Sequence, residues 1–222
     1  SQRGNLMQES WQEWLYPLGL ISSVAFTLRF LVQWIASEKA HASIVNKPFW
    51  WLSLAGNLTL GIHSFIQAQF HVFLVQVINS IISCRNLNLM EPKEFHWKRR
   101  YVALSLALGV IGSFCLFHFA SFEQWMRIPT HPFQKQALSL NFLWQSIGIA
   151  GVILFASRFW IQWLQSERID SSTLSRSFWW ISLTGALFSL VYFAKISDYI
   201  NLIGPLFGLI PYCRNLILMR RT

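Results

Sequence analysis

Two arginines stand in apolar segments of the sequence, and each is followed at helical spacing by an amide and a hydroxyl. In the first series Gln33 and Ser37 follow Arg29 by four and eight residues. Residues four apart share one face of a helix, so these three polar groups line one side of it. A guanidinium binds phosphate or carboxylate through two parallel hydrogen bonds, and amide and hydroxyl groups bind sugar hydroxyls or a phosphate edge. The spacing predicts a site for a phosphorylated or carboxylated, sugar-bearing compound.

The same series recurs 129 residues later as Arg158, Gln162 and Ser166, and an Arg-Asn pair follows each copy at the same distance. If the helices that carry these groups line one cavity, that cavity would be cationic and open to the cytoplasm. The candidate ligand-binding residues are Arg29, Gln33, Ser37, Arg85, Asn86, Arg158, Gln162, Ser166, Arg214 and Asn215.

A structural role explains these polar residues equally well. An arginine in the middle of a bilayer costs roughly 2.5 to 3.5 kcal/mol on insertion scales, so Arg29 and Arg158 need partners. Glu38, Glu167 and backbone carbonyls are available as partners, and the two asparagines could simply bridge helices. Arg85 lies about 7.5 Å of helix rise from the end of its predicted helix, so its side chain could reach the surface instead.

The segments that must position these groups have the composition of membrane helices. The chain of 222 residues is 54% hydrophobic and 12% charged. Its charges gather in short runs, and the apolar segments between them are about 18 to 23 residues long, as crossing a bilayer requires. The sequence predicts an all-α integral membrane protein with seven transmembrane helices. We expect them at Leu15–Ala36, Phe49–Gln67, His71–Met90, Tyr101–Ser121, Phe142–Leu164, Phe178–Lys195 and Tyr199–Met219.

The chain contains an internal duplication. Residues 27–90 and 156–219 align without a gap and share 21 identities in 64 positions. Each copy holds three predicted helices, so the extra helix between them gives both copies the same orientation, a 3+1+3 arrangement of parallel repeats. We divide the chain into a first repeat at 15–90, a linker with one transmembrane helix at 91–140, and a second repeat at 141–219.

The net charge of +9 fits membrane topology better than nucleic-acid binding, because the cations flank apolar helices. Ten lysines and arginines fall on the side of the C-terminus and four on the opposite side. This bias predicts a multi-pass membrane protein with its N-terminus outside and its C-terminus in the cytoplasm. Residues 1–13 are too polar for a signal peptide, so none is expected.

No residue pattern indicates catalysis. The three cysteines have neither CxxC nor Cys/His spacing, so we expect no metal site, and no cofactor motif is present. The sequence has neither a phosphate-binding glycine loop nor a supported catalytic triad. The Phe-Trp-Trp triplets at 49–51 and 178–180 begin two predicted helices. They are interpreted as anchors at the membrane interface, with ligand stacking as the alternative.

The RFxxQWxxSE, FWxxSxxG and RNLxLM blocks, each present twice, closely resemble the lipid A biosynthesis N-terminal domain family. That family is distantly similar to the SWEET and PQ-loop proteins, which are also built from three-helix repeats, although the Pro-Gln dipeptide is absent here. The resemblance implies a SWEET-like fold and a role in lipid A or related glycolipid metabolism. The polar positions that the resemblance carries over are Arg29, Gln33, Glu38, Arg85 and Asn86 in the first copy, and Arg158, Gln162, Glu167, Arg214 and Asn215 in the second.

The leading hypothesis is a membrane protein that binds or translocates a phosphorylated sugar-bearing lipid. The alternatives are a SWEET-like transporter of sugars or sugar phosphates, and a non-catalytic membrane partner of lipid-A-disaccharide synthase, a glycosyltransferase. We expect the chain itself not to be an enzyme, since the synthase's catalytic domain is absent from it, and we expect no nucleic-acid partner.

Overall fold

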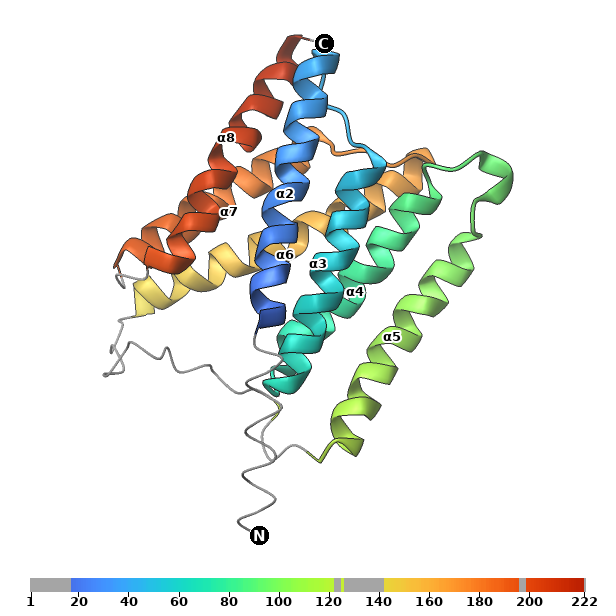
Figure 1. Ribbon diagram of the computed structural model, residues 1–222, viewed down its shortest axis with the longest axis vertical. Coiled ribbons are helices and arrows are strands. Elements are labelled where there is room, and N and C mark those ends of the chain that lie inside the picture. The colour runs from blue at the N-terminus through green and yellow to red at the C-terminus, as the bar shows by residue number, and fades with distance from the viewer. Residues whose placement is uncertain (1–16, 122–124, 126–141, 196–198, 222) are drawn as a thin grey trace.

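The computed structural model describes residues 17–121, 125, 142–195 and 199–221, and its elements are all helices (Figure 1). The expectation about a signal peptide and much of the predicted linker lie outside these residues. The helices are α2 (Pro17–Ala40), α3 (Lys47–Ile66), α4 (Phe70–Asn88), a short 3-10 helix η1 (Lys93–Phe95), α5 (Arg99–Phe119), α6 (Phe142–Ile169), α7 (Arg176–Lys195) and α8 (Tyr199–Arg221).

The all-helical class is confirmed, and every predicted helix is present. Five of them, α2, α4, α5, α6 and α7, are long and apolar enough to cross a membrane. The others, α3 and α8, are not in this group. Each carries polar residues within its length, among them Asn57 in α3 and Arg214 and Asn215 in α8. The count of seven spans therefore stays a prediction.

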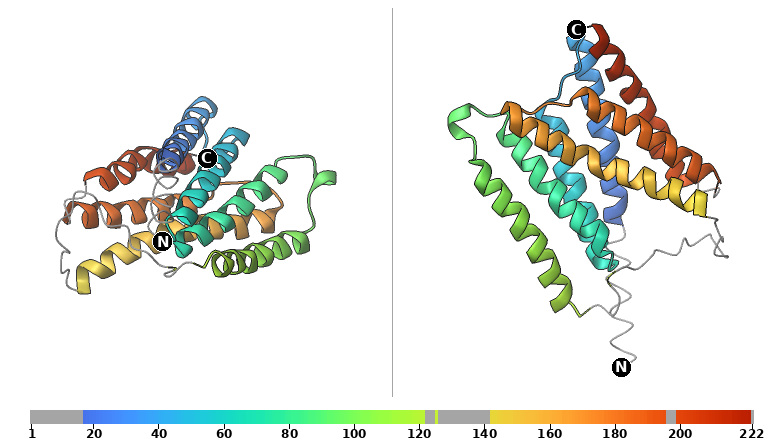
Figure 2. Two further views of the ribbon diagram at one scale, coloured as in Figure 1. Left: turned by 60° about the horizontal axis from the view of Figure 1, so that its bottom comes forward. Right: turned by 180° about the vertical axis from the view of Figure 1, so that it is seen from behind.

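The helices pack as two groups of three, with one helix beside them. Helix α3 contacts both α2 and α4, and α7 contacts both α6 and α8. The two groups meet where α2 contacts α8 and where α4 contacts α6, while α5 contacts α4 and lies at the flank (Figures 1 and 2). The first helix of each group thus contacts the third helix of the other. Equivalent residues of the two repeats therefore lie against equivalent helices.

The first helix of each repeat ends in the same way. His41 after α2 and Asp170 after α6 have φ angles of 51° and 54°, in the left-handed region that commonly terminates helices. Beyond them the amide N–H of Ala42 donates to the carbonyl of Ser37, and that of Ser171 donates to the carbonyl of Ser166, both at 3.2 Å. The loops that follow, 42–46 and 171–175, are thereby directed toward the other repeat.

The hydrophobic core lies between the two groups and is largely aromatic. Phe49, Trp50, Phe178 and Trp179 have no exposed surface, and their rings pack edge to face with Phe30 and Phe159. The interpretation of the Phe-Trp-Trp triplets as interfacial anchors is therefore wrong for the first two residues of each triplet. It fits only the third residues, Trp51 and Trp180, which are 59% and 47% exposed.

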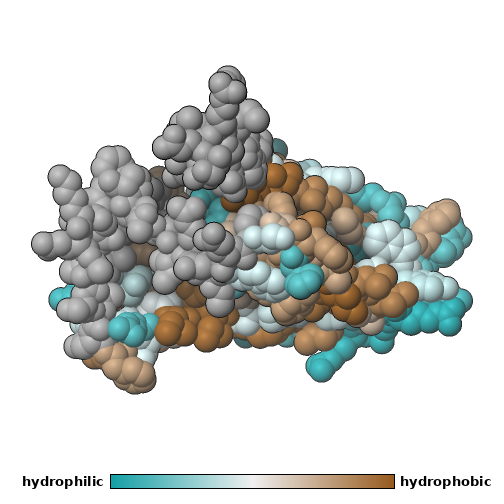
Figure 3. All heavy atoms as spheres, turned by 90° about the horizontal axis from the view of Figure 1, so that it is seen from below, coloured by the Kyte–Doolittle hydropathy of each residue, from teal (hydrophilic) through white to brown (hydrophobic). Residues whose placement is uncertain are grey.

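The outer surface is strongly apolar. Large hydrophobic side chains on α2, α5, α6 and α7 are exposed, among them Val24, Leu108, Val152 and Val191, each at 50% or more. Figure 3 shows hydrophobic side chains over much of the described part of one face, with hydrophilic ones toward its edge. Contiguous apolar surface of this kind marks a membrane or protein contact, in agreement with the candidate membrane-spanning helices.

Candidate ligand site

Two buried arginines lie at the centre of the interface between the repeats. Arg29 on α2 is 5% exposed and Arg158 on α6 is 8% exposed. Arg29 donates from Nη1 to the Ser53 hydroxyl at 3.3 Å, and Arg158 donates from Nη1 to the Tyr212 hydroxyl at 3.0 Å. Each guanidinium thus has one hydroxyl partner on a neighbouring helix of its own repeat.

Aromatic rings surround both guanidinium groups. The Cζ atom of Arg29 lies 4.5 Å from the ring centroid of Phe26 and 4.7 Å from that of Phe159. The Cζ atom of Arg158 lies 4.6 Å from the ring centroid of Phe155 and 5.3 Å from that of Phe30. Each arginine therefore contacts a phenylalanine of the other repeat. Cation–π contacts of about 2 kcal/mol at desolvated sites offset part of the cost of burying these charges.

The two positive charges have no negative partner in the part of the chain that the structure describes. Neither arginine forms an ion pair with a carboxylate there, and the Nε atom of each is buried without a hydrogen-bond partner. Both guanidinium groups contact the rings of Phe30 and Phe159, so the two like charges lie close together. A buried charge is normally paired, so this part of the interface carries an excess of positive charge.

The alternative that Glu38 or Glu167 neutralises these arginines is wrong, because the carboxylates bind other cations. Glu167 accepts from Nε and Nη2 of Arg85 at 2.6 and 2.9 Å. Glu38 accepts from Nε of Arg214, and from its Nη2 at 2.7 Å. Glu38 and Glu167 lie nine residues beyond Arg29 and Arg158, about 13 Å of helix rise, which places them near the helix ends where α4 and α8 carry their arginines.

The two ion pairs join the repeats but differ in burial. The side chains of Arg85 and Glu167 are 1% and 10% exposed, whereas those of Arg214 and Glu38 are 33% and 35% exposed. The expectation that Arg85 extends to the surface is therefore wrong. Arg85 also donates to the Asn88 side chain at 2.7 Å and to the Trp97 carbonyl at 2.9 Å, which explains why it is held inside.

The amides form a second layer of contacts across the interface. Gln33 exchanges two hydrogen bonds with Asn215, at 2.9 and 3.0 Å, and Gln162 exchanges two with Asn86, at 2.8 and 3.2 Å. Both glutamines also donate to a serine one turn later, Ser37 or Ser166, at 2.9 and 2.8 Å. All four amides are fully buried. The asparagines therefore bridge helices, as the structural interpretation required.

Two serines that the sequence interpretation did not single out complete this layer. The hydroxyl of Ser172 donates to Asn86 and accepts from the Trp50 indole, both at 2.8 Å. Its equivalent, Ser43, donates to Asn215 at 2.7 Å and accepts from the Trp179 indole at 3.1 Å. Ser43 and Ser172 are identical between the aligned repeats. Because residues in loops vary more than residues in helices, the presence of the same serine in both loops was the signal from which their role could have been predicted.

Tyr212 also escaped the sequence interpretation, because it occupies a position where the repeats differ. Its counterpart in the first repeat is Ser83, which accepts a weak hydrogen bond from Asn57 at 3.4 Å. A Cβ atom on Gly208 would lie 2.8 Å from the Tyr212 ring, so glycine at that position makes room for the phenol. The second repeat thus supplies an additional hydroxyl near Arg158, where the first has smaller polar groups.

The structure brings all ten candidate residues to the interface between the repeats, but their surroundings differ. Eight of them are engaged in ion pairs or amide and hydroxyl hydrogen bonds within the protein. Arg29 and Arg158 alone among the ten have a buried donor without a partner and no carboxylate nearby. This arrangement suits the binding of an anion. Among the described residues, no group of three histidine, cysteine or acidic side chains is placed to hold a metal ion.

Comparison with known proteins gives one consistent result. The chain is 35% identical over 217 residues to a lipid-A-disaccharide synthase of Chlamydia muridarum, covering 94% of this chain and 34% of the relative. It is 36% identical over 202 residues to that of Chlamydia pneumoniae, covering 91% and 33%. The chain thus spans about a third of the length of the curated relatives that it matches. No solved structure matches it.

The residues matched by the family comparison contain all ten candidates. The family described as Lipid A Biosynthesis N-terminal domain matches residues 18–88 and again residues 147–217. Two matches in tandem agree with the internal duplication and with the two groups of three helices. This chain belongs to the Lipid A Biosynthesis N-terminal domain family, of which it carries two copies.

Proposed function

We propose that this protein binds a phosphorylated, sugar-bearing lipid between its two repeats, with the phosphate held by Arg29 and Arg158. The observation that carries the proposal is the pair of buried guanidinium groups that have unpaired Nε donors and no carboxylate partner. A phosphate would neutralise both charges and accept hydrogen bonds from both arginines. The family and its relatives supply the context, the biosynthesis of lipid A.

The other eight candidates serve in this proposal to position the arginines. The Gln33–Asn215 and Gln162–Asn86 pairs, at 2.8 to 3.2 Å, fix α2 against α8 and α6 against α4. The arginine site then lies on helices that are held together by these two pairs of buried amides, and not on a loop. The binding function belongs to the arginines, and the bridging function to the amides, serines and ion pairs.

The proposal includes the arrangement in the membrane. All seven helices cross the bacterial inner membrane as parallel three-helix repeats in a SWEET-like 3+1+3 order, with the N-terminus in the periplasm and the C-terminus in the cytoplasm. The division at 15–90, 91–140 and 141–219 belongs to the same proposal. The excess of cations on the C-terminal side supports this orientation.

Replacing both Arg29 and Arg158 with glutamine is expected to abolish the binding of the phosphorylated lipid. A charge-assisted hydrogen bond contributes about 1.5 to 3 kcal/mol, so each single replacement should weaken binding by roughly 10- to 100-fold. Native mass spectrometry of the purified protein with lipid A, with dephosphorylated lipid A and with a polyprenyl phosphate measures the effect.

Arg168→Gln provides the matched control, because Arg168 is an exposed arginine on the same helix as Arg158. This variant should bind like the unaltered protein. Equal binding of lipid A to the doubly substituted and unaltered proteins would contradict the proposal, as would equal affinity for lipid A and its dephosphorylated form. Proteoliposome flux of a sugar or sugar phosphate, abolished by the same substitutions, would favour a transporter instead.

One observation favours a second candidate, a membrane partner of a glycosyltransferase. The matched relatives are named lipid-A-disaccharide synthases and are about three times as long as the segment they share with this chain. In this role the chain would hold the catalytic part at the membrane without binding its lipid. Co-purification with a lipid-A-disaccharide synthase, unaffected by substitution of Arg29 and Arg158, would support it.

A further inference from the structure

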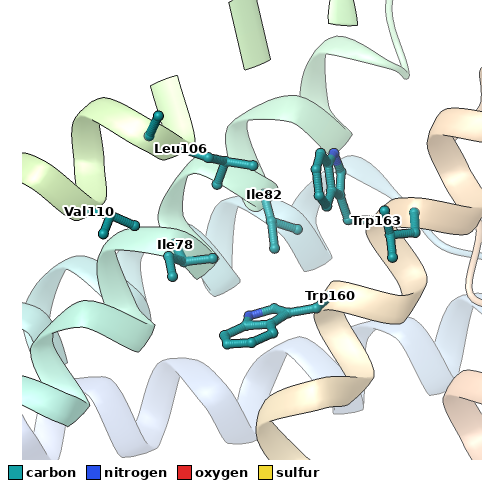
Figure 4. A pocket seen from close by; sticks show the side chains of 8 residues that line it. Ile78, Ile82, Leu106, Val110, Trp160 and Trp163 are labelled. Carbon is teal, nitrogen blue, oxygen red and sulfur yellow. The ribbon is translucent and has the colours of Figure 1, made fainter. Parts of the chain in front are cut away.

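An apolar groove runs between α4, α5 and α6, and none of its lining residues belongs to the arginine site. Its volume is about 340 Å³. Figure 4 shows side chains from the three helices directed toward one another around it. The residues labelled there are Ile78, Ile82, Leu106, Val110, Trp160 and Trp163.

The groove opens on the face of the protein that is most suited to hydrocarbon. Helix α5, which forms one wall, has the highest mean hydropathy of the five candidate spans, 2.1, and the smallest buried share, 17%. Its outward residues Leu104, Leu108 and Ile111 are 54 to 58% exposed. In a bilayer, such a wall faces lipid tails, so a hydrocarbon chain is the natural occupant of the groove.

Three consecutive cations stand at one end of this groove. Lys98, Arg99 and Arg100 are exposed at the start of α5. Leu106 and Val110 follow Arg99 by seven and eleven residues, so all three share one face of the helix, with about 10 Å of rise between Arg99 and Leu106. Arg99 is therefore aligned with the α5 wall of the groove, and Lys98 and Arg100 flank it on either side.

Arg99 also reaches the opposite wall. Its Nε atom lies 3.5 Å from the Glu167 carboxylate on α6, and it donates from Nη2 to the Glu167 carbonyl. Trp163, which lines the groove, donates its indole N–H to the same carboxylate at 3.0 Å. The Arg99 side chain is nevertheless 64% exposed, so donors remain available to a ligand. The cationic end and the apolar groove are thus contiguous.

Aromatic side chains flank the cations. Trp97 is 51% exposed and Tyr101 is 52% exposed, and the Arg100 guanidinium lies 5.0 Å from the Tyr101 ring centroid. Exposed tryptophan and tyrosine beside lysine and arginine are typical of the level at which lipid head groups lie. Head-group phosphates therefore meet these three cations at the depth where a chain in the groove would begin.

We propose that this groove holds one hydrocarbon chain of an anionic phospholipid whose phosphate is bound by Lys98, Arg99 and Arg100. An anionic lipid is favoured over a zwitterionic one because three adjacent cations near the membrane surface attract net negative charge. This lipid site is separate from the arginine pair between the repeats and does not depend on the function proposed for that pair.

The head-group half of the proposal is tested by native mass spectrometry in detergent. The probes are phosphatidylglycerol, phosphatidylcholine with the same chains, and soluble glycerol phosphate. The protein should retain one phosphatidylglycerol in at least tenfold preference over phosphatidylcholine, and glycerol phosphate at the same concentration should not displace it. Lys98→Gln with Arg100→Gln should reduce the preference while leaving the contacts of Arg99 with Glu167 intact, and adding Arg99→Gln should remove it.

The chain half is tested by filling the groove. Ala107→Trp places a large ring in it, since Ala107 lines the groove and is exposed. Leu108→Trp is the matched control, because Leu108 is 57% exposed, neighbours Ala107 and is absent from the lining. Ala107→Trp should weaken phosphatidylglycerol binding at least tenfold, and Leu108→Trp should leave it unchanged.

Three results would overturn the proposal. They are equal binding of the two phospholipids to the unaltered protein, unaltered binding to Ala107→Trp, and displacement of the lipid by glycerol phosphate. The last would mean that the cations bind a free phosphate group and that the groove contributes nothing. The melting temperatures of Ala107→Trp and Leu108→Trp, measured without added lipid, should agree, so a loss of binding reflects the groove and not misfolding.

Discussion

Replacing Glu167 with glutamine is expected to lower the free energy of unfolding by about 3 to 5 kcal/mol, because it leaves Arg85 buried without its negative partner. The same replacement at the equivalent position, Glu38→Gln, should have a distinctly smaller effect. The two glutamates occupy matching positions in the repeats and bind matching arginines. The main difference between the two pairs is their burial.

The surroundings of the two pairs explain the expected difference. Arg85 is 1% exposed, so a charge left there cannot be stabilised by water. Arg214 is 33% exposed, and water can solvate its guanidinium when the carboxylate is removed. Glu167 also lies 3.5 Å from Arg99, so its replacement affects two cations on two helices.

The measurement is the free energy of unfolding in mixed detergent micelles for each single variant. A double-mutant cycle with Arg85→Gln and Glu167→Gln separates the energy of the pair from the cost of leaving either partner unpaired. Equal destabilisation by Glu167→Gln and Glu38→Gln would contradict the assignment of one pair as buried and the other as exposed to solvent.

The sequence alone predicted the helices well, because apolar runs of membrane length are a strong signal. It placed the ends less well. Helix α2 continues to Ala40 and α6 to Ile169, several residues past the predicted ends, since polar residues also form helices once the apolar part is anchored. The repeat was predicted in register, and its identical polar positions include the glutamines, asparagines, glutamates and arginines that join the two groups of helices.

The pairing of the charged residues could not be predicted from the sequence. The argument from depth required partners for Arg29 and Arg158 and offered them Glu38 and Glu167, which instead bind Arg214 and Arg85. Which carboxylate pairs with which arginine depends on the contacts of α2 with α8 and of α4 with α6. These are long-range contacts of the tertiary structure, and the spacing of residues along one helix does not specify them. The extra burial of Arg85 did have a sequence signal, because Asn88, which accepts from it, is replaced by Ile217 in the other repeat.

The amide layer leads to the second large effect. Asn86→Leu is expected to destabilise the protein by about 2 to 5 kcal/mol, because it leaves two buried polar groups without partners at about 1 to 3 kcal/mol each. These groups are the Gln162 carbonyl oxygen, which accepts from Asn86 at 3.2 Å, and the Ser172 hydroxyl, which donates to it at 2.8 Å. Unfolding in mixed detergent micelles measures the loss.

The same helix offers an internal control, Asn79→Leu, in which the residue type and the substitution are identical. The side-chain oxygen of Asn79 is buried without a hydrogen-bond partner, so removing it relieves an unsatisfied group. This variant should be as stable as the unaltered protein or slightly more stable. If both variants lose stability equally, the amide bridge between α4 and α6 contributes nothing specific. If only Asn86→Leu does, the repeats are joined by their buried amides, and the arginine pair between them owes its position to that bridge.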